Sequence, residues 1–295
     1  MLTVFSIPKP FRDEFAIIQR NAIQSWQRLD PNCEVILFGS EIGTFEIATD
    51  LQLRHVPEVE RNEYGTPLVS DLFEKAQKIA SNPVLCYVNA DIILTRGFVT
   101  ALRLIHKPHF LMIGRRYNID IQAPLDFSEP DWENSLIELV KERAKPASVT
   151  AIDYFVFPRG FYSEIPRFAI GRYAWDQWLV YYARAAGVPV YDASEMAIAI
   201  HQNHGYMESQ AREAPETEIN MRLASMVKKE FHPFHLYDAT HIISQKGIRP
   251  ALARKYLWRR LMAMTVLYKP LHPFFLLGKK YRKLTVKDPG KVKNK

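Results

Sequence analysis

The stretch Pro83-Val-Leu-Cys-Tyr-Val-Asn-Ala-Asp-Ile92 decides the fold of this chain. It opens with a continuous apolar run, which is typical of a strand buried on both faces of a parallel sheet. Ligands of open α/β sheets bind at the carboxyl ends of such strands, and burying the charge of Asp91 there would be costly unless that charge is used. Asp91, beside the side-chain oxygen of Asn89, therefore predicts a site for a hard cation that bridges to phosphate. The alternative is that Asp91 only caps the following turn or helix.

The segments on either side alternate between strand and helix patterns. In the first half, strands are expected over residues 2–7, 34–38, 53–56, 84–88 and 110–113, with helices over 13–28, 67–80 and 98–104. In the second half, helices are expected over 129–140 and 175–187, and short strands over 151–157, 188–191 and 197–200. Short connections in this order predict an α/β fold with one doubly wound, mixed but mainly parallel sheet flanked by helices.

The composition is that of a globular protein with a sizeable core. The chain has 295 residues, of which 47% are hydrophobic, and this suits one large α/β domain or two small ones. Cys33 and Cys86 lie in or beside apolar strand patterns, so we expect buried free thiols rather than a disulfide. The first residues lead directly into the first expected strand with no signal-peptide pattern, which predicts a cytoplasmic protein.

Charge divides the chain into two parts. Residues 246–295 carry 15 Lys and Arg and one acid, Asp288, whereas residues 1–245 carry 24 Lys and Arg and 31 Asp and Glu. We therefore expect a mildly acidic domain over 1–245 and a basic C-terminal helical tail over 246–295. A basic tail favours a partner that carries phosphates, either nucleic acid or the anionic face of a membrane.

The tail also has an amphipathic helical pattern. Leu257, Leu261, Met264 and Tyr268 fall on one helical face, and the apolar stretch that follows is too short and too interrupted to span a bilayer. This pattern predicts attachment along an anionic membrane surface. The alternative is a helix packed on the domain and followed by a disordered basic end.

A helix start near residue 175 carries an acid between aromatic side chains. In Gly171-Arg-Tyr-Ala-Trp-Asp-Gln-Trp178, Asp176 falls in the first turn, where the helix dipole stabilises a negative charge, so capping is one interpretation. The other is that the carboxylate acts as a general base. Trp175 and Trp178 either offer flat surfaces that suit sugar rings or belong to the core.

Two histidines follow the last expected strand. His201 and His204 lie in what the pattern predicts to be a turn. Both are metal ligands by type, and we favour His204 because Gly205 lets the chain approach closely. A site made of Asp91 and a histidine would mix oxygen and nitrogen ligands, which suits Mn²⁺ better than Mg²⁺.

A charge also interrupts the strand pattern of residues 151–157. If it is buried there, Asp153 needs a partner. Arg115 and Arg116, which follow another apolar strand, are candidates for that partner. Alternatively, the two arginines form a pair on the surface, or they clamp a diphosphate, for which Arg is well suited. Asp153 could instead bind the hydroxyl groups of an acceptor.

The segment Tyr87-Val-Asn-Ala-Asp-Ile-Ile93 resembles the metal-binding Asp-x-Asp motif of the GT-A type nucleotide-sugar glycosyltransferases, with Asn89 in place of the first acid. The resemblance extends over residues 1–206. It implies a GT-A fold, a nucleotide-diphosphate sugar as donor, and a divalent cation, Mn²⁺ or Mg²⁺, held by Asp91 and His204. Because the last acid of the motif usually holds the metal, Asn89 leaves the site in place but opens the question of a weakly bound or dispensable metal.

The resemblance also implies binding roles by order along the chain. The donor nucleotide would contact Ser6, Ile7 and Pro8 after the first strand, Thr66, Ser70 and Asp71 at the start of the helix before the motif, and Asn89, Ala90 and Asp91 in the motif itself. Arg115 is expected at the diphosphate. Thr66 also suits a helix N-cap, with Pro67 at the first helical position. The acceptor would contact Asp153, Trp175 and Asp176, with Asp176 as the catalytic base if the reaction inverts configuration.

The leading interpretation is a metal-dependent glycosyltransferase that acts on a glycan or lipid-linked acceptor, at the inner face of a membrane if the tail binds lipid. A non-catalytic nucleotide- or glycan-binding protein with the same fold is the alternative, and Asn89 favours it. A nucleotidyltransferase would show a Gly-rich basic loop after the first strand, and residues 5–11 contain no glycine; dinucleotide and P-loop motifs are also absent from the sequence. Tyr256 and Trp258 lie between basic residues and suit base stacking, but the acidic domain argues against nucleic acid.

Overall fold

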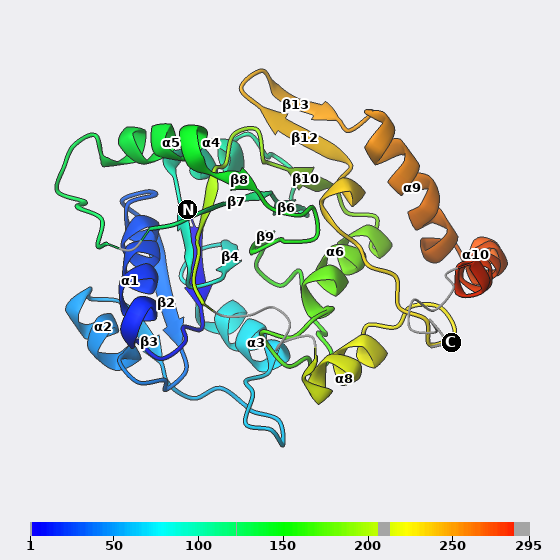
Figure 1. Ribbon diagram of the computed structural model, residues 1–295, viewed down its shortest axis with the longest axis horizontal. Coiled ribbons are helices and arrows are strands. Elements are labelled where there is room, and N and C mark those ends of the chain that lie inside the picture. Colours follow the sequence, from blue (N-terminus) through cyan, green and yellow to red (C-terminus); the bar gives the residue numbers. More distant parts are fainter. Residues whose placement is uncertain (1, 122, 206–212, 286–295) are drawn as a thin grey trace, which may run out of the picture.

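The structure is a computed structural model that describes residues 2–121, 123–205 and 213–285. Its centre is a nine-stranded sheet in the order β13-β12-β10-β6-β9-β4-β1-β2-β3 (Figure 1). The strands are β1 (Leu2–Ser6), β2 (Glu34–Phe38), β3 (Arg54–Val56), β4 (Val84–Val88), β6 (Leu111–Ile113), β9 (Tyr154–Pro158), β10 (Val190–Asp192), β12 (His241–Ser244) and β13 (Gly247–Pro250). Neighbouring strands are parallel except where β9 or β13 takes part. The expected mixed, mainly parallel sheet is confirmed.

Helices cover both faces of this sheet, because successive side chains of each strand point to opposite sides. The α-helices of the described residues are α1 (Asp13–Gln27), α2 (Thr44–Asp50), α3 (Val69–Ile79), α4 (Arg96–Arg103), α5 (Trp132–Arg143), α6 (Trp175–Ala185), α8 (Pro215–Leu223), α9 (Arg254–Leu267) and α10 (His272–Thr285), of which α5 packs on the smaller second sheet. Val4 of β1 packs in one core with Trp26 of α1, and its neighbour Phe5 packs in the other with Phe73 of α3. β1 is buried along its whole length, and the hydroxyls of its two polar residues, Thr3 and Ser6, are hydrogen-bonded inside the protein. Both cysteines are free, as their apolar surroundings predict.

A second, four-stranded sheet starts where the Asn-Ala-Asp turn ends. Its order is β5-β11-β7-β8, and its strands are β5 (Ile92–Leu94), β11 (Ala199–Gln202), β7 (Arg116–Ile119) and β8 (Lys145–Pro146). β11 runs antiparallel to β5, with His201 opposite Ile92, the residue after Asp91. The turn that carries Asp91 therefore joins the two sheets, and β11 is brought beside it.

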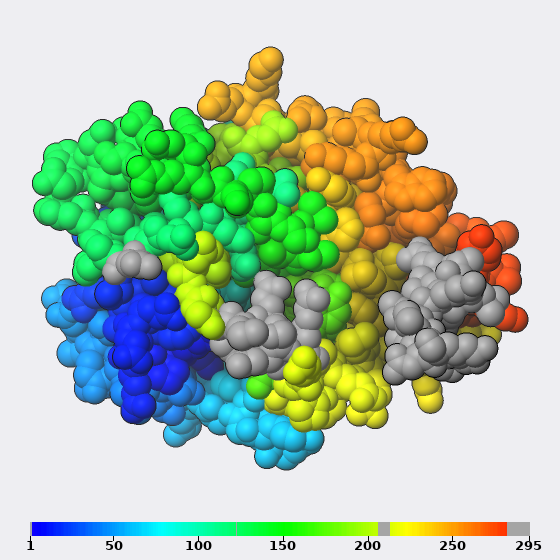
Figure 2. All heavy atoms as spheres, viewed as in Figure 1, coloured from blue at the N-terminus to red at the C-terminus, as the bar shows by residue number. Residues whose placement is uncertain are grey.

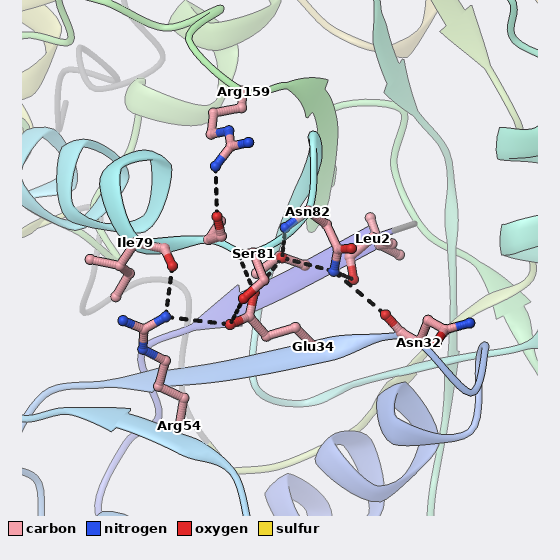
Figure 3. A network of polar contacts seen from close by, with 10 residues as sticks. Leu2, Asn32, Glu34, Arg54, Ile79, Ser81, Asn82 and Arg159 are labelled. Atoms are coloured by element: carbon pink, nitrogen blue, oxygen red, sulfur yellow. Dashed lines mark hydrogen bonds and ion pairs between the residues drawn. The ribbon is translucent and has the colours of Figure 1, made fainter.

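A polar network closes the opposite end of the main sheet (Figure 3). Glu34, at the start of β2, accepts hydrogen bonds from the backbone N–H and the hydroxyl of Ser81, at 2.7 and 3.0 Å. Arg54 of β3 lies 3.5 Å from the same carboxylate. Asn82, just before β4, donates to the carbonyl oxygen of Leu2 in β1 at 2.9 Å. These contacts tie the first residues of the strands together and leave their carboxyl ends, where Asp91 lies, as the end available for a site.

The basic segment does not begin a separate unit at residue 246. β13 pairs with β12 of the main sheet, so the expected boundary after residue 245 falls inside a β-hairpin and is corrected here. α9 then packs on the body. The Tyr256 hydroxyl donates to Asp192 at 2.6 Å, and Arg259 pairs with the buried Asp238 at 2.6 Å. The expected tail is therefore part of the folded body at least through α9, because its own side chains complete the packing.

α10 leaves α9 at a sharp angle. Within the described residues, no single helix is long and apolar enough to cross a membrane. The segments Arg254–Leu267 and Lys269–Tyr281 would together be long and apolar enough to cross a membrane. The chain bends by 97° between them. The end of the expected tail, residues 286–295, lies outside the described residues.

Candidate metal and catalytic site

Asp91 lies in the turn between the two sheets and faces two histidines. Its Oδ2 is 3.1 Å from Nε2 of His204 and 3.6 Å from Nε2 of His201. The backbone N–H of Gln202 donates to the carbonyl oxygen of Asp91 at 3.3 Å, which holds the turn against β11. The structure thus brings Asp91 and His204 together and adds His201 to them. The expected turn after the last strand is wrong for His201, because this residue lies inside β11 and two strands of the main sheet follow later in the chain.

The three side chains have the composition and spacing of a metal site. One ligand atom from each lies within 4.8 Å of the others. Asp91 Oδ1 and His201 Nδ1 are buried without a hydrogen-bond partner among the described residues. Burial raises the pKa of Asp91, but a hydrogen bond from His204 and the charges of both histidines and Arg116 outweigh it and bring that pKa to about 2. Burial lowers the pKa of His201. An ionised carboxylate beside a neutral imidazole suits a divalent cation.

Both ends of the Asn89 amide are used inside the protein. Its Oδ1 accepts a hydrogen bond from the Tyr87 hydroxyl at 2.8 Å, and its Nδ2 donates to Oδ1 of Asp153 at 2.7 Å. Oδ2 of Asp153 pairs with Arg116 at 2.9 Å. A carboxylate at position 89 would lack the donor and would set two negative oxygens at hydrogen-bond distance. The departure from the Asp-x-Asp pattern is therefore explained by Asp153.

Asp153 pairs with one of the two arginines that the sequence offers as partners, but it does not lie inside a strand. It precedes β9, which begins at Tyr154, so it does not interrupt a strand. Its partner is Arg116, which lies at the start of β7. Arg115 instead donates from Nε to the carbonyl oxygen of Ala147 at 2.7 Å. A diphosphate contact from Arg115 stays a prediction, and so does binding of acceptor hydroxyls by Asp153.

Asp176 lies in the first turn of α6 with a strongly perturbed carboxyl group. Burial raises its pKa, the N–H of Gln177 lowers it and the charge of Asp153 raises it, which together bring it to about 7. Its Oδ1 is buried without a hydrogen-bond partner among the described residues. The helix is entered through Ala174 at φ 89°, a left-handed conformation that is unusual for a residue with a Cβ. A carboxyl group that titrates near neutral pH is suited to accept a proton.

The two tryptophans beside Asp176 belong to the core. Trp175 and Trp178 are only 6% and 9% exposed. The Trp175 ring packs edge-on against Tyr87, with 5.3 Å between the ring centroids, and this contact links α6 to the strand that leads to Asp91. We therefore correct the expectation that Trp175 offers a surface for a sugar ring, because the packing of α6 onto the sheet covers it.

The residues expected around the nucleotide base fall into two groups. Ser6 is fully buried and its hydroxyl donates to the carbonyl oxygen of Val88 at 2.6 Å, so it links β1 to β4 and is not presented to a base. Ile7 is half-buried and Pro8 is buried. Contacts of a nucleotide with the main chain at Ile7 and Pro8, and with Ala90 in the turn, stay predictions.

The start of α3 differs from its expected form. The helix begins at Val69 with Leu68 as the N-cap residue, so Thr66 is not the cap. Thr66 belongs to the preceding turn, where its N–H donates to Oδ1 of Asn62 at 2.9 Å. Asp71 accepts hydrogen bonds from the N–H of Glu60 and from Lys75, at 2.7 and 2.9 Å. A nucleotide contact by Thr66, Ser70 and Asp71 is untested by this geometry and stays a prediction.

Lys9 is a charged residue near the site that the motifs did not reveal. Burial lowers its pKa, and the charges of Asp91 and Glu14 act in the opposite direction. Its backbone is held by the side chain of Gln19, which accepts from the N–H at 2.7 Å and donates to the carbonyl oxygen at 2.9 Å. In the sequence, this residue is a lysine between two prolines, directly after the first strand. The loop there lies at the edge of the sheet where ligands bind.

Comparison with known proteins bears on the fold. No family model matches the sequence, and no curated protein sequence matches it. S. aureus TarS 1–349, in complex with UDP-GlcNAc, matches in structure with a TM-score of 0.51 and 13% identity, over 76% of this chain and 66% of TarS 1–349. The chain has a GT-A glycosyltransferase fold. It thus spans just under two thirds of that TarS fragment, and at this identity the likeness concerns the GT-A fold alone.

Two further structures match over most of this chain. M. tuberculosis glucosyl-3-phosphoglycerate synthase has a TM-score of 0.48 and 15% identity, over 80% of this chain and 88% of that chain. A mannosyltransferase from Pyrobaculum calidifontis, in complex with GDP-Man and Mn²⁺, has a TM-score of 0.43 and 14% identity, over 70% of this chain and 58% of that chain. The assignment of the GT-A fold rests on the TarS match and on the topology described above.

Proposed function

We propose that the protein is a metal-dependent glycosyltransferase that moves a sugar from a nucleotide-diphosphate sugar to an acceptor hydroxyl. The observation that carries this proposal is the group of Asp91, His201 and His204 at the carboxyl edge of a GT-A sheet. The solved structure of TarS 1–349 with UDP-GlcNAc supports a nucleotide sugar as the donor. Unsatisfied buried atoms on Asp91 and His201 support a ligand at this place.

The residues divide the chemistry between donor and acceptor. A divalent cation held by Asp91, His201 and His204 would offset the charge of the departing diphosphate. In an inverting reaction Asp176 takes the proton of the acceptor hydroxyl while the hydroxyl oxygen attacks the anomeric carbon. The bond from that carbon to the diphosphate oxygen breaks, and the nucleoside diphosphate leaves with the electron pair. The pKa of about 7 gives Asp176 a substantial ionised fraction at neutral pH.

The acceptor is proposed to be a glycan, free or carried on a lipid. A lipid-linked acceptor would require the protein to work at a membrane face, and the C-terminal helices give an independent reason to expect that. The alternative, a non-catalytic binding protein, loses its main support because Asn89 is explained by its bond to Asp153. A binding protein also has no use for a carboxyl group such as Asp176, whose burial costs stability when it ionises.

A thermal-shift screen tests the donor site. Purified protein is heated with UDP, GDP, CDP, TDP or ADP, each with Mn²⁺, Mg²⁺ or EDTA. We expect one diphosphate to raise the melting temperature by about 5 °C in the presence of metal and not in EDTA, since ligand at about 100 times its Kd stabilises the folded state by about 2.7 kcal/mol. The responding base names the donor class.

Two variants complete the test. Asp91→Asn should lose the shift, whereas Glu164→Gln, at an exposed position, should keep it. No shift with any nucleotide would overturn the donor site. A metal-dependent shift without turnover of the matching nucleotide sugar, in the presence of glycan acceptors, would instead support the binding-protein alternative.

A further inference from the structure

The outward face of α9 is apolar although nothing among the described residues covers it. The inward face packs on the body through Tyr256, Ala263 and Val266, which are all buried. On the opposite side Leu257, Leu261, Met264 and Tyr268 are 45%, 53%, 46% and 60% exposed. Their spacing of three and four residues sets them in one stripe along the helix. A helix that is apolar on both sides is normally buried on both, so this stripe calls for a partner.

The apolar surface continues on the next helix. In α10, Phe275 is buried against the body, whereas Phe274, Leu277 and Tyr281 are 64%, 62% and 69% exposed. Trp258 adds a large exposed ring beside the α9 stripe, at 61%. We call these eight residues the C-terminal apolar surface: Leu257, Trp258, Leu261, Met264, Tyr268, Phe274, Leu277 and Tyr281. The two helices that carry it form the outer edge of the molecule, on the side away from α1 and α2 (Figures 1 and 2).

This concentration is specific to the C-terminal helices. Among the described residues before α9, the large exposed apolar side chains occur singly or in pairs: Ile42 and Phe45, Tyr64, Met221 and Leu223, and Ile248 and Leu252. Isolated exposed apolar residues of that kind are ordinary, whereas a contiguous set marks an interaction surface.

The charge that the C-terminal helices themselves carry is of one sign. From Lys246 to Lys287 the sequence contains no acidic residue, while the preceding residues carry more acids than bases. Arg254, Lys269 and Lys280 are exposed at the two ends and the bend of the helix pair. A second copy of the chain is a poor occupant, because pairing the two surfaces would bring their positive charges together. Base stacking is also disfavoured, because Tyr256 is buried with its hydroxyl bound to Asp192.

We propose that the C-terminal apolar surface docks the protein on an anionic lipid membrane, with α9 and α10 lying in the interface. Apolar side chains that enter the acyl boundary, with basic side chains at the level of the headgroups, are the pattern of interfacial helices. The bend of 97° lets both helices contact one lipid surface from the edge of the body. The proposal stands apart from the sugar-transfer chemistry, so either can fail without the other.

Vesicle flotation with the full-length protein tests the proposal. Vesicles of phosphatidylcholine with 30% phosphatidylglycerol serve as the anionic probe, and pure phosphatidylcholine serves as the neutral one. We expect the wild type to float with anionic vesicles, and Leu261→Glu and Trp258→Glu each to lower the partition coefficient by about tenfold or more. Phe45→Glu is the matched control, because Phe45 is similarly exposed, at 65%, but lies in α2, and it should bind as the wild type does.

Two further variants separate insertion from charge and from folding. Trp258→Phe should keep binding but lose most of the fluorescence quenching by brominated lipid, which places this ring in the bilayer. Arg254→Gln with Lys269→Gln should weaken binding to anionic vesicles by about tenfold or more, since each basic residue near such a surface contributes about 1 kcal/mol, or fivefold. Failure of the wild type to float would overturn the proposal. Equal loss of binding with Phe45→Glu would overturn it too, and so would a dimer in solution that Leu261→Glu separates.

Discussion

Nε2 of His204 lies 3.1 Å from Oδ2 of Asp91, although 113 residues separate them in the chain. The contact is produced by the pairing of β11 with β5, which sets His201 opposite Ile92 and leads the chain back over the turn that carries Asp91. The same pairing puts Nε2 of His201 3.6 Å from the same carboxylate oxygen. Two histidines and one carboxylate thereby meet at the edge of the sheet where a nucleotide sugar is proposed to bind.

If this group holds the metal, each histidine is needed for affinity. His201→Gln and His204→Gln should each weaken Mn²⁺ binding by about tenfold or more. Changing a residue that only hydrogen-bonds to a metal ligand already lowers the metal affinity by about this factor. Titration of free Mn²⁺ by electron paramagnetic resonance measures this directly. His109→Gln, at an exposed position, should bind Mn²⁺ as the wild type does. Unchanged affinity in both site variants would show that the metal, if bound, is held elsewhere.

Asp176→Asn should slow transfer strongly yet stabilise the fold at alkaline pH. Because burial raises the pKa of Asp176 from 3.8 to about 7, the folded state keeps a proton between those pH values that the unfolded state has lost. Stability therefore falls as pH rises through this window, and the amide escapes the loss. We expect a gain on the order of 4 kcal/mol at pH 8 that disappears near pH 4, and a rate lower by about 10² to 10⁴.

Urea unfolding at pH 4, 6 and 8 measures the first effect and sugar transfer the second. Glu164→Gln serves as the control for both, since its side chain is exposed. A stability difference that does not change with pH would contradict the assignment of the raised pKa to Asp176.

Restoring an acid in the motif should harm the site rather than improve it. Asn89→Asp removes the donor to Asp153 and places two carboxylates at hydrogen-bond distance, so we expect a loss of about 1 to 3 kcal/mol at pH 8. The loss should shrink at pH 5, where the pair can share a proton. Denaturation at both pH values and Mn²⁺ titration give the readouts. Tighter metal binding with unchanged stability would show instead that position 89 faces the metal.

A buried ion pair contributes to the attachment of α9 to the body. Arg259 lies 2.6 Å from Oδ2 of Asp238, whose side chain is fully buried and also accepts the backbone N–H of His235 at 2.8 Å. Arg259→Met leaves that carboxylate without its cation, so we expect about 3 kcal/mol of destabilisation in urea. Arg254→Met, an exposed change in the first turn of the same helix, should stay within about 0.5 kcal/mol. Equal effects would mean that the pair contributes nothing to docking.

Local patterns in the sequence were sufficient for the sheet and for one end of the site. β4 is predicted from its apolar run, and Asp91 from its place as the first charged residue after that run. This works because burial on both faces disfavours charged side chains inside a central strand, so the first charge comes after the strand has ended. Asp176 is predicted for a similar local reason, since an acid in a first helical turn is visible in the sequence.

Other features depended on contacts between distant segments. From the sequence, Arg115 and Arg116 were equivalent candidates for the partner of Asp153. In the structure the partner is Arg116, which lies at the start of β7. Thr66 looked like a helix cap, and the turn formed with Asn62 overrode that preference. Lys9 is near Asp91 because Gln19 of α1 holds the loop after β1. No sequence motif predicts this contact.

By itself, the sequence determined that an α/β sheet forms, that Asp91 follows one of its central strands and that the last part of the given sequence is basic and amphipathic. These follow from burial, charge and helical periodicity, which act between neighbouring residues. Only the tertiary structure decided that His201 joins Asp91, that Asn89 holds Asp153, and that β13 and α9 belong to the body. These depend on strand pairing and on side chains meeting across the sheet, and the spacing of residues along the chain carries no information about either.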